Sequence, residues 1–196
     1  MSASARLSVG VFATSDADRP EPATDELLAR RGDAASFALL YERHLPPVYR
    51  YLAGRLRSPE EAEDLCSEVF RQAWTSRGGY RGRGSFRAWL FSIVRRTLAD
   101  HYRRRPPPAP LEPALAARLL DESPGPEDQA TRVERSGQAR RLLAGLSPQQ
   151  QEVLLLRFAG ELSYADIAHV IGKREEAVKK IAYRALEALR ARTTDG

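Results

Sequence analysis

Residues 163–192 read SYADIAHVIGKREEAVKKIAYRALEALRAR, and this stretch decides the fold of the C-terminal part of the chain. It begins at a serine, a preferred helix N-cap, and apolar side chains recur at helical spacing from Ile167 onward. Gly172 ends this short helix, and a longer helix over 175–192 carries an apolar stripe that starts at Val178. A short helix, a glycine turn and a longer basic helix predict a helix-turn-helix, whose second helix enters the DNA major groove.

Several polar side chains lie off that apolar stripe or at its margin, where they would face a ligand. They are Arg174, Lys179, Lys180, Tyr183 and Arg184. Glu175 and Glu176 suit the first turn of a helix but repel phosphate, although a glutamate there can accept a hydrogen bond from cytosine. The alternative interpretation is an ordinary helical hairpin with a solvated basic face.

Upstream, Ser58 and Pro59 form a strong helix start, because serine caps the helix and proline fits its first position. The spacing buries Ala62, Leu65, Val69 and Ala73, with Phe70 at the margin, and leaves Glu61, Asp64, Glu68 and Arg71 outside. This acidic face is either a solvated surface or a docking site for a partner.

A glycine-rich loop and a basic helix follow in the sequence. Residues 78–86 read GGYRGRGSF, and the next helix, residues 86–105, carries six arginines beside an apolar stripe that includes Trp89. Arginine and aromatic side chains in a glycine-rich loop are suited to single-stranded nucleic acid, in which bases stack on rings. The loop lacks the GxxxxGK[ST] pattern of a nucleotide-phosphate loop.

The chain of 196 residues divides by composition. Residues 1–24 read as a flexible tail, and residues 25–105 as a helical domain with a net charge of +6 from 16 basic and 10 acidic side chains. Residues 106–126 form an acidic, proline-rich linker, residues 127–192 a second helical domain, and 193–196 a short C-terminal tail. We therefore predict an all-α fold of two small helical domains joined by a flexible linker, the second containing the helix-turn-helix.

Composition also excludes several classes of protein. Cys66 is the only cysteine, so an intrachain disulfide or a cysteine-rich zinc site is impossible. No apolar run reaches the roughly 18 residues of a membrane span, and the N-terminus lacks the features of a signal peptide, so we expect a cytoplasmic protein. A metal-dependent helical nuclease would need clustered carboxylates, yet the dense group at residues 60–64 is spread around a helix. We expect no catalytic residue, metal or cofactor.

Taken in order, these segments resemble an extracytoplasmic-function (ECF) sigma factor, the two-domain form of the bacterial RNA polymerase initiation factor. The resemblance covers residues 25–192. Its motifs in the first domain are AEDL at 62–65, EVF at 68–70, YRG at 80–82, SFRAWL at 85–90 and DH at 100–101. Those in the second domain are LSP at 146–148, QEVLLLR at 151–157, GELSYADIA at 160–168 and RAL at 184–186.

The resemblance implies a role for each surface. The core-polymerase contact, with the clamp helices of the largest subunit, would fall on Asp64, Glu68 and Arg71. The melted −10 element would be bound by Tyr80, Arg81, Arg83, Ser85, Phe86, Arg95, Arg96 and Arg103. The duplex −35 element would be bound by Arg157, Ser163, Tyr164, Arg174, Glu175, Glu176, Lys179, Lys180, Tyr183 and Arg184. The second domain would also pack on the polymerase flap, the linker would run toward the active-site cleft, and an anti-sigma factor is a further partner that the resemblance raises without identifying.

A stand-alone helix-turn-helix repressor or activator, with an N-terminal effector domain, is the main alternative. It explains residues 127–196 but leaves the loop of glycine, arginine and aromatic residues without a purpose. Binding to bare duplex DNA in the absence of polymerase would favour it.

Overall fold

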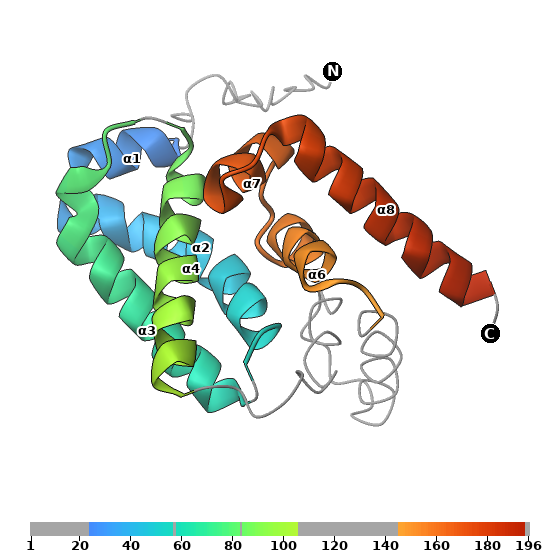
Figure 1. Cartoon of the computed structure of the whole chain (residues 1–196). Coiled ribbons are helices and arrows are strands. Elements are labelled where there is room, and N and C mark those ends of the chain that lie inside the picture. The colour runs from blue at the N-terminus through green and yellow to red at the C-terminus, as the bar shows by residue number, and fades with distance from the viewer. Residues whose placement is uncertain (1–23, 57, 83, 106–144, 195–196) are drawn as a thin grey trace, which may run out of the picture.

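The computed structural model describes residues 24–56, 58–82, 84–105 and 145–194, and all regular structure in these ranges is helical (Figure 1). The expected N-terminal tail up to residue 23, the linker 106–126 and the beginning of the second domain lie outside them. None of the helices in these ranges combines the length and the apolarity that a membrane crossing requires.

The N-terminal half is a bundle of α1 (Asp25–Arg31), α2 (Ala34–Ala53), α3 (Pro59–Ser76) and α4 (Phe86–Arg104), with the short 3₁₀ turn η2 (Arg77–Gly79) before the loop. Gly32, with a φ of 64°, allows the tight turn that sends the chain from α1 into α2. Asp25 then ties α1 back to α2 by contacts of 2.8 Å to Arg43 and 2.7 Å to the buried ring of His44.

The predicted helix starts in this half are confirmed. The Ser58 hydroxyl accepts a hydrogen bond from the Glu61 amide at 3.1 Å, with Pro59 in the first turn of α3. The Ser85 hydroxyl accepts from the Ala88 amide at 3.0 Å at the start of α4. The predicted inward face of α3 is buried, and Phe70 at its margin is buried with it.

The C-terminal half comprises α6 (Pro148–Leu154), the π-helical turn η4 (Leu155–Ala159), α7 (Tyr164–Ile171) and α8 (Glu175–Thr194). Ser147 caps the start of α6 and forms a capping box with Gln150, in which each side chain bonds the other's backbone amide. Ser163 and Asp166 form the same motif on α7, and Gly172 ends that helix in the left-handed conformation. The helix-turn-helix is therefore present as predicted.

The two halves pack against each other. Helix α4 contacts α7, helix α2 contacts η4, and α8 extends away from this contact (Figure 1). One continuous apolar core runs from Leu28 and Phe91 in the N-terminal half to Leu156 and Ile167 in the C-terminal half. The sequence predicted two domains on a tether, but it did not predict that they share a core.

Candidate nucleic-acid interface

The outer face of α3 carries the acidic side chains that the sequence placed there. Asp64 is exposed, whereas Glu68 accepts hydrogen bonds of 2.7 and 2.6 Å from the Arg71 guanidinium and 2.6 Å from Gln72. These bonds, led by those from Arg71, lower the pKa of Glu68 to about 2. The Arg71 guanidinium therefore favours the ionised carboxylate and at the same time partly neutralises it.

A groove of about 300 Å³ separates the start of α3 from the end of α4. It is lined by Glu61, Asp64, Leu65, His101, Arg104 and Arg105. Its two sides carry opposite charges, and Asp64 forms part of its acidic side. The acidic face predicted from α3 alone is thus half of a mixed-charge groove that two helices build.

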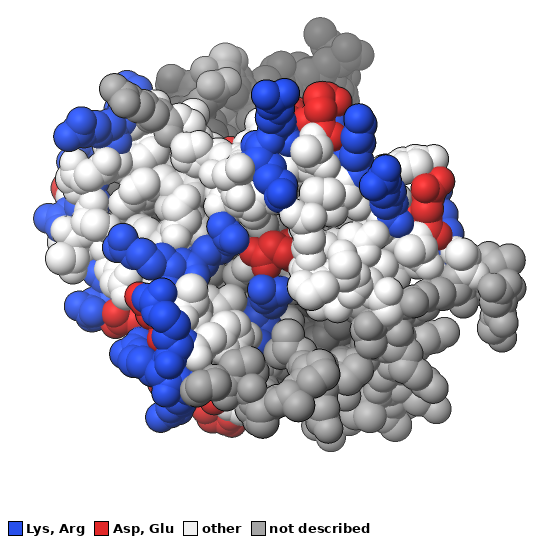
Figure 2. All heavy atoms as spheres, viewed as in Figure 1, with Lys and Arg blue, Asp and Glu red and all other residues white. Residues whose placement is uncertain are grey.

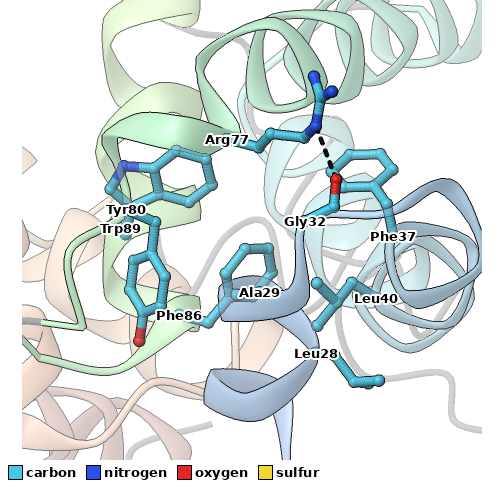
Figure 3. A pocket seen from close by; sticks show the side chains of 9 residues that line it. All are labelled: Leu28, Ala29, Gly32, Phe37, Leu40, Arg77, Tyr80, Phe86 and Trp89. Atoms are coloured by element: carbon cyan, nitrogen blue, oxygen red, sulfur yellow. Dashed lines mark hydrogen bonds between the residues drawn. The ribbon is translucent and has the colours of Figure 1, made fainter.

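The aromatic residues of the glycine-rich loop face inward. Tyr80 is 8% exposed and Phe86 2%, and their rings pack edge-to-face with centroids 5.7 Å apart. Trp89 packs on both rings, and the adjoining cavity, about 10 Å³, holds no more than one water molecule (Figure 3). The expectation that Tyr80 and Phe86 present their rings to unpaired bases does not match this conformation, because both rings complete the core under the loop.

Side-chain hydrogen bonds fix the loop at each of its ends. The Arg77 guanidinium donates to the Gly32 carbonyl oxygen at 2.9 Å, as Figure 3 shows, and the Tyr80 hydroxyl donates to the Gly84 carbonyl oxygen at 3.1 Å. Gly82 has a φ of 68°, and a Cβ atom there would lie 2.7 Å from the Arg30 guanidinium. Glycine at this position therefore allows both the turn and the close approach of an arginine.

The predicted −10 residues differ in accessibility. Arg81, Arg96 and Arg103 are exposed, and Arg83 lies outside the described residues. Arg95 is half-buried because its guanidinium donates to Glu152 on α6. The Ser85 hydroxyl contacts Asp166 on α7 at 2.6 Å. Part of this surface therefore faces the C-terminal half instead of solvent.

On the C-terminal half, most of the predicted −35 residues are exposed on one corner. In Figure 2, lysine and arginine atoms gather over the α7 end of α8. The exposed members are Ser163, Arg174, Glu175, Glu176, Lys179, Lys180, Tyr183 and Arg184. Tyr183, at 62%, is the most exposed large hydrophobic side chain in the described residues.

Several of the predicted −35 residues have structural partners. Lys179 lies 2.9 Å from Glu175 and 3.2 Å from Glu176, so the two glutamates partly neutralise it. Arg157 donates to the Leu162 carbonyl oxygen at 2.7 Å and stacks over the Tyr164 ring at 4.9 Å. Arg157 and Tyr164 thus support the turn before α7 and are half-buried, which the sequence did not predict.

Sequence reasoning missed the acidic residues that join the two halves. Glu152 contacts Tyr51, Arg55 and Arg95, and Glu161 contacts Arg50 and Arg87. One signal for Glu152 was visible in the sequence, because this residue directly precedes four consecutive apolar residues. These four, Val153 to Leu156, are buried on α6 and η4. No local pattern indicated its partners, because they lie about 60 to 100 residues earlier in the chain.

Comparison with known families finds two matches, in the order in which the two halves occur. Residues 40–106 match the model of Sigma-70 region 2, and residues 136–189 match Sigma-70, region 4. The ECF RNA polymerase sigma factor BldN of Streptomyces coelicolor is 38% identical over 165 residues, which are 82% of this chain and 61% of BldN. The RNA polymerase sigma factor YlaC of Bacillus subtilis is 32% identical over 74% of this chain and 85% of its own length.

Two solved structures share the fold. CnrH, in complex with the cytosolic domain of CnrY, superposes with a TM-score of 0.66 at 22% identity, covering 87% of this chain and 97% of that one. The sigma factor RpoE of Bartonella quintana, in complex with the anti-sigma factor NepR, superposes with a TM-score of 0.59 at 21% identity, covering 81% and 96%.

Proposed function

Because this chain belongs to the ECF sigma factors of the sigma-70 family, we propose that it binds core RNA polymerase and directs initiation by contacting two promoter elements, one with each half. The observation that carries the proposal is the pairing of a basic helix-turn-helix with an arginine-rich helical bundle in one chain. Catalysis would belong to the polymerase, and the chain would supply promoter specificity. Within the described residues no group of His, Cys, Asp and Glu is suited to hold a metal ion.

We assign the upstream duplex element to α8. Arg174 stands just before this helix and Lys180 in its second turn, both exposed, so they can reach base edges and phosphates when the N-terminal end of α8 lies in the major groove. A helix that enters the groove end-on places its first two turns closest to the bases.

We assign the melted downstream element to exposed arginines of the loop and of α4, chiefly Arg81 and Arg96. The buried rings of Tyr80 and Phe86 hold the loop that positions Arg81, whereas Arg96 is positioned by α4. A base leaving the duplex would meet a cationic surface here, since the adjoining cavity is too small to hold it.

We assign the polymerase contact to the groove between α3 and α4, to which Asp64 contributes, together with the adjoining face of α3 that carries Glu68. An anti-sigma partner belongs to the proposal as well, because RpoE, which shares the fold, is held by the anti-sigma factor NepR. Such a partner would act by covering this groove or the basic surfaces.

Transcription in vitro with purified core polymerase tests the proposal directly. The chain should produce discrete start sites on genomic templates, and polymerase alone should not. Arg81→Ala with Arg96→Ala should slow initiation on duplex templates but recover on pre-melted ones, whereas Arg174→Ala with Lys180→Ala should be defective on both. Arg31→Ala, an exposed arginine on α1, is the matched control. Tight, specific binding to bare duplex without polymerase would instead support a stand-alone regulator.

A further inference from the structure

A buried carboxylate joins the two halves of the molecule. The Glu152 side chain on α6 is 12% exposed, and its Oε1 accepts hydrogen bonds of 3.0 Å from the Tyr51 hydroxyl and 3.0 Å from Arg95 Nε. Its Oε2 lies 2.8 Å from Arg55 Nη2. These partners come from α2, from the turn after it and from α4, so one carboxylate holds three segments of the N-terminal half. We call this set the Glu152 cluster.

A second hydrogen bond also joins Arg95 to the C-terminal half. Its Nη1 donates to the Val170 carbonyl oxygen of α7 at 2.5 Å, while its Nε binds Glu152. The guanidinium therefore contacts two helices of the C-terminal half at once. A guanidinium engaged in this way cannot at the same time bind a nucleic-acid phosphate through these nitrogens.

A second group of contacts lies beside the cluster. The Arg50 and Arg87 guanidinium groups both bind the Glu161 carboxylate, and Arg87 also donates to the Glu161 carbonyl oxygen at 2.7 Å. Glu161 has a φ of 57°, a conformation that costs a non-glycine residue about 1 kcal/mol. A Cβ atom on the preceding Gly160 would lie 2.8 Å from the Phe91 ring of α4 and 2.9 Å from the carbonyl oxygen of Leu156.

The charges at this junction are complementary. Figure 2 shows acidic atoms between basic ones where the two halves meet. All the acidic members, Glu152, Glu161 and Asp166, come from the C-terminal half, and the arginines Arg50, Arg55, Arg87 and Arg95 all come from the N-terminal half. The C-terminal half thus covers an arginine-rich face with its own carboxylates.

Promoter geometry conflicts with this arrangement. Elements named −35 and −10 lie about 25 base pairs apart, or roughly 85 Å along B-form DNA at 3.4 Å per base pair. A compact chain of 196 residues has a radius of gyration of about 16 Å and so a diameter of roughly 40 Å. One closed body cannot reach both elements, so the halves must separate before both are bound.

We propose that Glu152 is a latch that keeps the unbound chain closed, and that promoter recognition requires its release from Arg55 and Arg95. The inference rests on the proposed function in one respect, the requirement that the two halves of the chain separate. In the closed state the C-terminal half engages two of the Arg95 guanidinium nitrogens and keeps α8 within one compact body, which is too small to span both promoter elements. Release of Glu152 removes one of the two bonds that hold Arg95. Separation of the halves then also breaks the Val170 and Glu161 contacts, which frees Arg95 and moves α8 away with the C-terminal half.

Energy transfer between two dyes on the full-length chain, without polymerase, tests the latch. Ala35→Cys on α2 and Ala191→Cys on α8 give exposed labelling sites, and the buried Cys66 is spared by maleimide dyes. The wild-type background should show one high-transfer population. Glu152→Gln keeps the shape but removes the charge, and should lower the ratio of closed to open molecules at least about tenfold, as expected when a buried ion pair loses one partner.

Tyr51→Phe removes a single hydrogen bond and should lower the ratio only a few-fold. Glu63→Gln, an exposed glutamate on α3, is the matched control and should leave it unchanged. Circular dichroism distinguishes opening of the two halves from unfolding, because an open but folded chain retains its helical signal. Low transfer in the wild-type background, or unchanged transfer in a folded Glu152→Gln variant, overturns the latch.

Adding core polymerase and a promoter separates this inference from the proposed function. Transfer should fall in the wild-type background as transcripts appear. Transcripts without a fall in transfer overturn the opening step while the sigma activity stands. A Glu152-dependent shift in the free chain without any transcripts supports the latch and contradicts the proposed function.

Discussion

Phe86 offers the sharpest test of how the glycine-rich loop works. The ring is 2% exposed at the first position of α4, and its centroid lies 5.7 Å from Tyr80, 5.4 Å from Trp89 and 5.3 Å from His44. Substitution by alanine removes the buried ring and leaves a cavity among three rings that cannot all collapse into it. Such a change costs about 3–5 kcal/mol, from lost burial and the cavity together.

The measurement is urea unfolding followed by tryptophan fluorescence. Both tryptophans, Trp74 and Trp89, lie on helices of the N-terminal half, so the signal reports the part of the molecule that contains Phe86. With a typical slope of about 2 kcal/mol per molar urea, Phe86→Ala should lower the midpoint by about 2 M. Leu27→Ala removes a side chain that is 46% exposed and should cost no more than about 0.5 kcal/mol.

A conservative variant separates folding from promoter opening. Phe86→Leu keeps most of the buried volume, should cost about 1.5 kcal/mol or less and should still support opening of a duplex promoter. If Phe86→Ala loses less than about 1 kcal/mol, the ring does not support the core as argued. If Phe86→Leu folds normally but fails only on duplex templates, the aromatic face acts on the bases themselves.

Three further outcomes are expected. Asp64→Arg with Glu68→Arg should weaken binding to core polymerase in a pull-down while losing under about 0.5 kcal/mol of stability per site, and a cooperative loss of fold would show that this face is buried. Burial lowers the pKa of His44 against the opposing effect of Asp25, so the ring is neutral in the fold, and stability should fall as the pH drops below about 6.5. A urea midpoint that rises on acidification, or falls equally in His44→Gln, would contradict this. Burial raises the pKa of Cys66 to about 12, so thiol reagents at pH 8 should label it only after unfolding, and rapid labelling of the native chain would place it at the surface.

The local structure of this protein could be predicted from its sequence because each signal acts over a few residues. Ser58, Ser85, Ser147 and Ser163 each accept a hydrogen bond from a backbone amide three residues later, and a preferred cap at the start of an apolar period is visible in the sequence. Gly172 likewise ends α7 in a left-handed conformation that favours glycine. These features determined the helices and the helix-turn-helix.

The exposed basic surface of α8 could also be predicted from periodicity, since an amphipathic helix turns its polar side outward whatever it packs against. The loop was harder. Tyr80 and Phe86 stand among glycines and arginines, a composition typical of an open nucleic-acid loop. Only the packing of α1 against α4 shows that both rings are needed to complete the core.

The junction between the halves was decided by tertiary structure alone. Glu152 reads in sequence as one more polar residue near the start of a helix. Its partners Tyr51 and Arg95 are 101 and 57 residues away, and each appears unremarkable in its own helix. Helical periodicity specifies which side of a helix is apolar and which is polar. It does not specify which distant residue a polar side chain will contact. The sequence therefore determined the two binding elements, whereas the contact that holds them together arises only when the helices pack and a carboxylate from one half is buried among the arginines of the other.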